Sequence, residues 1–256
     1  MNDPFTIEGA HVLVTGGSSG LGRFFAVFLA ARGARVTVGA RRAEALAKTV
    51  EDIGSANGQA QSVVMDVTVA ASIETALDAA EAHFGPVEIV INNAGVTATR
   101  PALQQDEADW DKVIDTNLKG VWLVAQAVGR RMVAHKVKGS IVNVASILGL
   151  RVASAVAPYA MSKAGVVQMT KALALEWARY GIRVNALAPG WMEGDWMEKA
   201  LGDNYERLME RRAKATPLKR CATADDVGLT AVALATSMRF TTGQTIVIDG
   251  GFSAVT

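Results

Sequence analysis

Near the start of the chain a short apolar run leads directly into a glycine-rich turn and then into a helix-like segment. Residues 11–15 (HVLVT) are apolar enough for a buried strand, residues 16–22 (GGSSGLG) form the turn, and the helix-like run ends at Gly33. Glycine lets a backbone turn tightly and approach a ligand, and a helix N-terminus presents unpaired N–H groups to an anion. This order of elements predicts a turn that holds the phosphates of a dinucleotide; an ordinary tight turn is the alternative.

Strand-like and helix-like segments alternate along the rest of the chain. Further strands are expected at about residues 35–39, 62–67, 88–91, 139–145, 182–188 and 245–248. Helices are expected between them at about residues 43–53, 72–84, 106–135, 158–180 and 223–235. Such alternation predicts βαβ units and a parallel sheet, with the ligand outside the carboxyl ends of the strands.

The end of the second predicted strand carries two arginines and no acid. Ala40-Arg41-Arg42 follows this strand directly. In dinucleotide folds an acidic residue here holds a ribose 2′-hydroxyl, whereas an arginine suits a 2′-phosphate because it offers two donors and a permanent charge. The pair therefore favours NADP(H) over NAD(H) as cofactor, although two arginines at a helix start can also be merely solvated.

Polar residues and a glycine recur where other predicted strands end. Asp66, Asn92, Asn93 and Gly95 all fall at such ends, and Ser146 follows the predicted strand 139–145. The carboxyl ends of parallel strands meet at one edge of the sheet, so we expect these residues to lie around one site.

Asn117 is unusual because it lies in the middle of the long predicted helix 106–135, among apolar neighbours. A buried amide must find hydrogen-bond partners or lower stability. Asn117 is therefore either a satisfied core residue or part of a polar site.

Tyr159 and Lys163 stand four residues apart at the start of the predicted helix 158–180. Side chains at positions i and i+4 lie on one face of a helix. A nearby ammonium favours the phenolate, so we expect Lys163 to lower the pKa of Tyr159 from about 10. A phenol tuned in this way can act as a general acid or base, whereas a surface pair with no chemistry is the alternative reading.

The composition indicates a cytoplasmic protein with a sizeable core. Half of the 256 residues are hydrophobic, the formal net charge is +1, and Cys221 is the single cysteine. These features give no reason to expect nucleic acid or a membrane as partner, and a lone cysteine fits a reducing compartment. No apolar run is long enough to span a bilayer, the N-terminus does not resemble a signal peptide, and no cluster of His, Cys and Asp suggests a metal.

Taken together, these residues resemble the short-chain dehydrogenase/reductase family over nearly the whole chain, from Val12 to Gly251. The resemblance is specific because several motifs occur in the family's order and spacing. They are Thr15-Gly16-x-x-x-Gly20-x-Gly22, Asn92-Asn93-Ala94-Gly95, Asn117, Ser146, Tyr159-x-x-x-Lys163 and Pro189-Gly190. The resemblance implies one α/β domain over residues 1–256: a Rossmann-like, doubly wound, seven-stranded parallel sheet with helices on both faces and a substrate lid at about 191–216.

The family also implies a catalytic role for four of these residues. Tyr159 would exchange a proton with the oxygen of a carbonyl or alcohol substrate. Lys163 would lower its pKa and hold the nicotinamide ribose, Ser146 would hydrogen-bond the substrate oxygen, and Asn117 would hold a water in a relay to Lys163. The reaction implied is hydride transfer between NADP(H), or less readily NAD(H), and a small ketone or secondary alcohol, with no metal.

The remaining motif positions carry over as cofactor-binding residues. They are Gly16, Ser18, Ser19, Gly20, Leu21, Gly22, Arg41, Arg42, Asp66, Val67, Asn93, Ala94, Gly95, Tyr159, Lys163, Pro189, Gly190 and Met192.

A few positions depart from the family pattern and bear on the alternatives. Gly194 replaces a threonine that many members use toward the cofactor, and Trp191 is bulkier than usual. An acyl-carrier-protein reductase would carry two docking arginines; Arg130 resembles one, but Leu175 stands at the place of the second. A 3-oxoacyl-thioester reductase is thus the alternative substrate reading, and a catalytically silent NADP(H)-binding protein is the remote one. The family resemblance further implies a homotetramer or homodimer.

Overall fold

The computed structural model describes residues 6–254 and contains a seven-stranded sheet in which every pairing is parallel. The strand order is β3-β2-β1-β4-β5-β6-β7, so the order reverses between β1 and β4. This confirms the predicted Rossmann-like fold. The strands are β1 His11–Thr15, β2 Arg35–Ala40, β3 Gln59–Val64, β4 Ile89–Asn92, β5 Ser140–Val144, β6 Arg183–Pro189 and β7 Thr245–Ile248.

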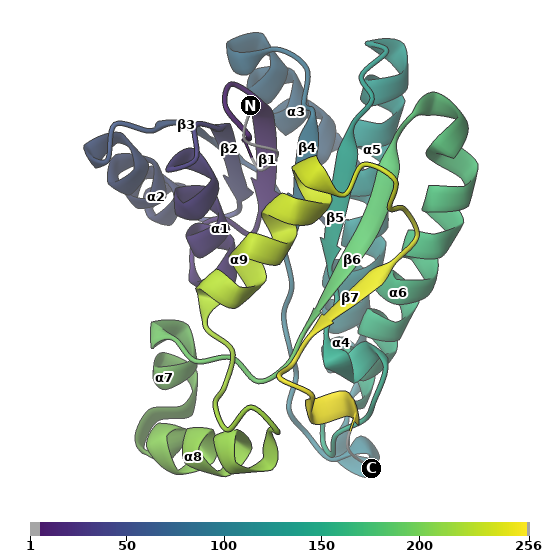
Figure 1. Ribbon diagram of the computed structural model, residues 1–256. Coiled ribbons are helices and arrows are strands. Elements are labelled where there is room, and N and C mark those ends of the chain that lie inside the picture. Colours follow the sequence, from purple (N-terminus) through teal and green to yellow (C-terminus); the bar gives the residue numbers. More distant parts are fainter. Residues whose placement is uncertain (1–5, 255–256) are drawn as a thin grey trace.

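Helices cover both faces of this sheet, as Figure 1 shows. The described α-helices are α1 Gly20–Ala30, α2 Ala43–Ser55, α3 Ala70–Phe84, α4 Glu107–Ile114, α5 Gly120–Ala134, α6 Ala157–Trp177, α7 Asp195–Leu201, α8 Tyr205–Ala215 and α9 Ala224–Val232. Among the described residues, no helix has the length and apolarity needed to cross a membrane.

Alternate side chains of the central strands enter two separate cores. In β1, Val12 and Val14 pack with α1, α2 and α9, whereas Leu13 packs with α3, α5 and α6. In β4, Ile91 and Val90 divide in the same way. A strand buried on both faces must be apolar throughout, which is why these segments read as continuous apolar runs in the sequence.

Helix starts follow local signals in the sequence. Thr223 and Asp226 form a reciprocal capping box at the start of α9, and the Asp106 carboxylate accepts a hydrogen bond from the Asp109 N–H at the start of α4. Both caps satisfy N–H groups that have no partner within the helix.

Two of the predicted elements differ from the structure. The strand predicted at 62–67 is β3, Gln59–Val64, because this edge strand pairs in register with β2 from Arg35 onward and its apolar tail enters the core after pairing ends. The single helix predicted at 106–135 is divided into α4 and α5 by a π-helical turn, Asp115–Lys119. Helical periodicity in a sequence does not reveal such a local insertion.

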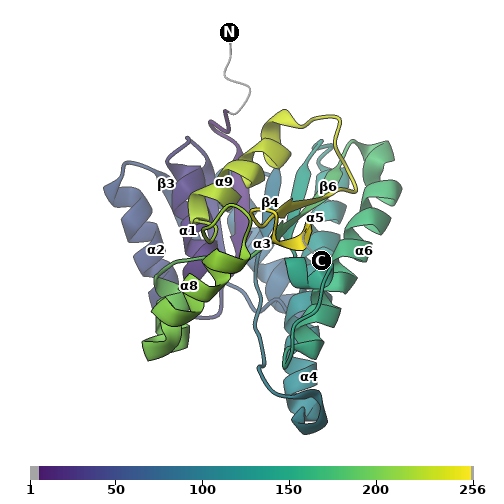
Figure 2. The same ribbon diagram turned by 60° about the horizontal axis from the view of Figure 1, so that its bottom comes forward.

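The carboxyl ends of the strands are flanked by two projecting parts of the chain. Figure 1 shows α7 and α8 set apart from the sheet, and Figure 2 shows α8 and α4 on opposite sides of this face.

The other end of β1 carries a buried histidine. His11 is fully buried; its Nδ1 lies 2.7 Å from the Gly85 carbonyl oxygen and its Nε2 lies 2.9 Å from the Thr37 hydroxyl. Because a carbonyl only accepts, we assign the proton to Nδ1, and Nε2 then accepts from Thr37. Burial is the main cause that lowers the pKa of His11 from 6.5. The fold therefore requires the neutral ring.

We expect stability to fall on acidification because of His11. Its folded-state pKa lies below the unfolded value, so between these two values the unfolded chain binds more protons and stability rises with pH. The melting temperature, followed by circular dichroism from about pH 7.5 to about pH 5, should fall less steeply in His11→Gln than in the wild type. The exposed His83, changed to Gln, is the matched control. An unchanged slope in His11→Gln contradicts the assignment.

Candidate active site

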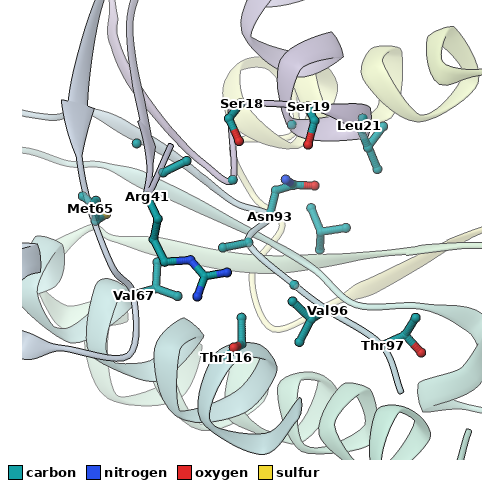
Figure 3. A pocket seen from close by; sticks show the side chains of 18 of the residues that line it. Ser18, Ser19, Leu21, Arg41, Met65, Val67, Asn93, Val96, Thr97 and Thr116 are labelled. Atoms are coloured by element: carbon teal, nitrogen blue, oxygen red, sulfur yellow. The ribbon is translucent and has the colours of Figure 1, made fainter. Parts of the chain in front are cut away.

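A cavity of about 580 Å³ opens at the carboxyl ends of the strands, where the strand order reverses. The structure brings fifteen of the predicted cofactor positions to its wall (Figure 3). They are Gly16, Ser18, Ser19, Gly20, Leu21, Gly22, Arg41, Arg42, Asp66, Val67, Asn93, Ala94, Gly95, Tyr159 and Lys163. The cavity wall does not include Pro189, Gly190 or Met192, which lie where β6 ends and the lid begins.

The glycine turn is shaped by contacts that exclude a side chain. A Cβ atom on Gly22 would lie 2.2 Å from the Gly16 carbonyl oxygen and 2.5 Å from Nδ2 of Asn93. Gly16 has φ of +70° and Gly20, the first residue of α1, has φ of +54°. The turn therefore needs glycine both for conformation and for close packing. It leaves the N-terminal turn of α1 facing the cavity.

One hydroxyl joins this turn to the end of β4. Thr15 Oγ1 accepts hydrogen bonds from the N–H groups of Asn93 and Ala94, each at 3.0 Å, and donates to Asn92 Oδ1 at 3.3 Å. Nδ2 of Asn93 donates to the Thr15 carbonyl at 3.0 Å. The amide of Asn93 thus supports the wall of the cavity through the backbone of Thr15.

Positive charge gathers at the β2 end of the cavity. Figure 3 shows the Arg41 side chain extending from the end of β2 into the cavity. Arg42 donates from Nη2 to the hydroxyl oxygens of Ser18 (3.3 Å) and Ser19 (3.0 Å). Hydrogen bonds from the backbone and side chain of Thr68, together with the charge of Arg41, hold the pKa of Asp66 below its ordinary value. The ionised Asp66 and the two arginines make this end strongly polar.

The opposite end of the cavity holds the tyrosine, the lysine and the serine. Tyr159 and Lys163 occupy the first turns of α6, and Ser146 lies two residues after the end of β5. The Ser146 side chain hydrogen-bonds the phenol of Tyr159. Nζ of Lys163 lies 5.7 Å from the centre of the Tyr159 ring and donates to the Val144 carbonyl oxygen at 2.7 Å. Segments far apart in the sequence thus meet at one wall.

Asn117 reaches the same wall from the π-helical turn. Its Oδ1 accepts from the Val96 N–H at 2.7 Å, and its Nδ2 donates to the Val96 carbonyl at 2.8 Å and to Ser162 Oγ at 3.3 Å. A Cβ on Gly95 would lie 3.4 Å from Asn117 Oδ1 and 3.7 Å from Lys163 Nζ. Gly95 therefore keeps open the space between the amide and the ammonium.

Comparisons with known proteins cover almost the entire chain. A family model described as enoyl-(acyl carrier protein) reductase matches residues 16–253. Gluconate 5-dehydrogenase of Gluconobacter oxydans (strain 621H) is 34% identical over 252 residues, which are 98% of this chain and 97% of the relative. The 3-oxoacyl-(acyl-carrier-protein) reductase FabG of Escherichia coli (strain K12) is 37% identical over 249 residues, or 97% and 99% of the two chains.

A solved structure shows that the similarity extends to the three-dimensional fold. The gluconate 5-dehydrogenase from Burkholderia cenocepacia J2315, in complex with NADP and tartrate, superimposes with a TM-score of 0.92 at 34% identity and 99% coverage of both chains. The chain belongs to the short-chain dehydrogenase/reductase family. It is an oxidoreductase that interconverts a carbonyl compound and an alcohol with a nicotinamide cofactor.

In this short-chain dehydrogenase/reductase the pKa of the tyrosine differs from the prediction. Burial raises the pKa of Tyr159, and the hydrogen bond from Ser146 opposes this only in part. Burial also lowers the pKa of Lys163 to about 8. The expectation that Lys163 lowers the pKa of the phenol is therefore wrong for this structure. The physical reason is that Lys163 is directed at the Val144 carbonyl and is itself desolvated, which disfavours its charged form.

The glycine that departs from the family pattern has a conformational reason. Gly194 precedes α7 with φ of +145° and ψ of 159°, a region essentially restricted to glycine. Its N–H lies 3.3 Å from the hydroxyl oxygen of Tyr205, the first residue of α8. A threonine at this position would require a different backbone, at a cost of about 1–3 kcal/mol.

Several wall residues were not predicted from the sequence. Val144 is the last residue of β5 and Ala145 follows it, and the strand-end rule that pointed to Ser146 applies to them as well. Thr116 lines the cavity from the π-helical turn, and nothing in the local pattern indicates this. Within residues 6–254, no group of three or more His, Cys, Asp and Glu side chains is arranged to hold a metal ion.

Proposed function

We propose that this protein is an NADP(H)-dependent reductase that interconverts a small ketone and a secondary alcohol, with Tyr159 as the general acid and base. The observation that carries the proposal is the arrangement of charged and proton-exchanging side chains around one cavity. Arg41 and Arg42 stand at one end, and a buried tyrosine, hydrogen-bonded to a serine and adjacent to a lysine, stands at the other.

The residues present fit a dinucleotide with a 2′-phosphate. The turn at Gly16–Gly22 leaves no room for a Cβ and so admits close approach of a pyrophosphate to its backbone. Arg41 and Arg42 would bind the 2′-phosphate, because guanidinium groups bind phosphate through paired, charge-assisted hydrogen bonds. Asp66 and Val67 would border the adenine. Pro189, Gly190 and Met192 stay proposed nicotinamide neighbours, although they lie outside the described cavity wall.

The proton chemistry follows from the burial of Tyr159. When bound, the nicotinamide supplies or accepts the hydride. Tyr159 has a raised pKa, so its phenol is protonated at neutral pH and can donate a proton to the oxygen of the carbonyl. Without substrate, Ser146 hydrogen-bonds the phenol; when a carbonyl binds, its single hydroxyl proton can turn to the substrate oxygen, where negative charge develops. In oxidation the phenolate must accept the proton, so this direction gains from higher pH.

The proton must then be replaced from solvent. We propose that Asn117 holds a water next to Lys163 in the space that Gly95 leaves open. Lys163, with its pKa at about 8, is poised to pass protons near neutral pH and would also hold the nicotinamide ribose. The lid, about residues 191–216, would cover the substrate half of the same domain.

A 3-oxoacyl thioester is the alternative substrate, because a reductase of that class is 37% identical to this chain. Leu175 is largely exposed and presents an apolar side chain where a second arginine would dock the acidic carrier, and the lack of that charge weakens this alternative. NADPH consumption with plain ketones, a polyhydroxylated keto acid and acetoacetyl-CoA distinguishes the candidates. Preference for the thioester would favour the alternative. No turnover of any of them would favour the third candidate, a catalytically silent NADP(H)-binding protein.

We expect Tyr159→Phe to lose turnover by about 10²- to 10⁴-fold, because the ring stays in place and only the proton donor is removed. The dissociation constant for NADPH, measured by fluorescence titration, should remain unchanged. Tyr180→Phe, beyond the end of α6, is the matched control and should keep wild-type rates. Wild-type turnover in Tyr159→Phe would exclude this residue as the acid.

We expect Arg41→Ala to raise the KM for NADPH by about 10- to 100-fold, because one charge-assisted phosphate contact is lost. The KM for NADH should change little, since NADH has no 2′-phosphate. Lys48→Ala, at an exposed position of α2, controls for the loss of a positive charge. A wild-type preference for NADH would make Arg41 a solvated surface residue and would overturn the cofactor assignment.

We also propose a homotetramer or homodimer located in the cytoplasm. Trp110, Trp122 and Met161, on α4, α5 and α6, are each 39–47% exposed, and these large apolar side chains are available for contact with another chain. Sedimentation velocity should give a dimer or tetramer, and Trp122→Glu should shift it to smaller species. A wild-type protein that sediments only as a monomer would contradict the assembly.

A further inference from the structure

The lid is attached firmly at its base but loosely along its length. At the base, the Gly190 N–H donates to Ile248 O at 2.9 Å, the Ala222 N–H donates to Trp191 O at 2.8 Å, and the Leu218 N–H donates to Gly250 O at 3.2 Å. Beyond the base, none of the described side chains of α8 is buried. Because no described side chain of α8 is buried, the position of this helix depends on a few contacts of partly exposed side chains.

One such contact joins α8 to the start of the lid. The guanidinium carbon of Arg212, in the last turn of α8, lies 4.1 Å from the centre of the Trp191 ring. The Trp191 ring also contacts Phe252 in an edge-to-face arrangement, with ring centres 6.0 Å apart and an angle of 78° between the ring planes. A cation over an indole face is attracted by the ring quadrupole, most strongly where water is partly excluded. Arg212 is half-buried there, as the contact requires.

The stack continues to the catalytic side of the site. The Phe252 carbonyl oxygen accepts a hydrogen bond from Nη1 of Arg151 at 3.1 Å, and Arg151 lies five residues after Ser146. The lid helix, the turn after β6, the C-terminal segment and the loop after β5 are thus connected by consecutive contacts.

The charge of Arg212 has no carboxylate partner within the part of the chain that the structure describes. Its guanidinium lies over the Trp191 ring and near the Met209 sulfur, which is 3.8 Å from Nη1. By contrast, Arg220 pairs with Asp226, and Lys214 pairs with Glu210 on α8 itself. The indole is therefore the partner that orients Arg212.

We propose that Arg212 is a positioning residue whose stacking on Trp191 holds α8 where the lid covers the substrate. The inference rests on the proposed function, because the lid matters only if the substrate binds beneath it. The proposal also gives a physical reason for the bulky Trp191 directly after Pro189-Gly190, because the indole is the surface on which Arg212 of the lid helix stacks.

The stack should act on substrate affinity more than on chemistry. A lid that occupies its covering position for a smaller fraction of the time lowers apparent affinity by that fraction. Tyr159, Lys163 and Ser146 are untouched by the change. Loss of the stack should thus raise the KM for the carbonyl substrate and leave kcat unchanged, or raise it if lid opening limits turnover.

The test compares Arg212→Gln with Arg211→Gln, an exposed neighbour on the same helix that removes the same charge. In Arg212→Gln we expect the KM for the carbonyl to rise about three- to tenfold, with an unchanged dissociation constant for NADPH. Limited trypsin digestion, followed by mass spectrometry at Lys199 and Arg207, should be faster by a similar factor. Arg211→Gln should match the wild type in both readouts. Either an unchanged KM or an unchanged cleavage rate in Arg212→Gln overturns the proposal.

Further variants show whether Arg212 acts through the indole. Arg212→Lys keeps a cation over the ring and should restore most of the wild-type KM. In a Trp191→Leu background, Arg212→Gln should have no further effect. If the leucine variant does not fold, Trp191→Phe weakens the stack without removing it, and Arg212→Gln should then have a smaller effect than in the wild type. Additive effects overturn the proposal. If the wild type turns over no carbonyl compound, the proposed function fails, while the digestion still tests the stack.

Discussion

The active site depends on one buried hydroxyl at the point where the strand order reverses. Thr15 Oγ1 is fully buried, accepts two backbone hydrogen bonds from the segment after β4 and donates one to Asn92. Its hydrogen-bonding capacity is thereby fully used, which is what a polar group inside an apolar sheet requires. The glycine turn begins at the next residue. The hydrogen bonds of the Thr15 hydroxyl therefore hold this turn against the part of the cavity wall that carries Asn93 and Gly95.

The two ends of the cavity have opposite electrostatic character, and each suits a different part of the ligand. The β2 end is open and carries Arg41 and Arg42, whose charges persist at any physiological pH. The α6 end is desolvated, and burial moves both Tyr159 and Lys163 toward their neutral forms. A permanent cation suits a phosphate, whereas groups that gain and lose protons suit a reacting oxygen. One cavity can therefore bind a charged cofactor at one end and exchange a proton at the other.

Order within the site comes from the body of the protein, and we propose that adjustability comes from the lid. Asn117 is held by both backbone groups of Val96 and by Ser162, so the wall that it forms is rigid. The described side chains of α8 are all at least partly exposed, and a single stacked arginine joins this helix to Trp191. A lid attached in this way can open for exchange without disturbing the residues that move the proton.

The sequence alone determined the elements of the fold and most of the cavity wall. Apolar periodicity, glycines and strand-end polar residues are local signals, and they indicated the seven parallel strands, the turn at residues 16–22, the arginines after β2, and the pairing of Tyr159 with Lys163. Only the tertiary structure decided the rest, because it depends on contacts between distant segments. The Val96 backbone holds Asn117 within a π-helical turn, the Val144 carbonyl binds Lys163, burial reverses the expected pKa shift of Tyr159, and Arg212 meets an indole twenty-one residues before it. Desolvation and stacking arise only when the folded chain brings distant segments around these groups, so a pattern of neighbouring residues in the sequence cannot predict them.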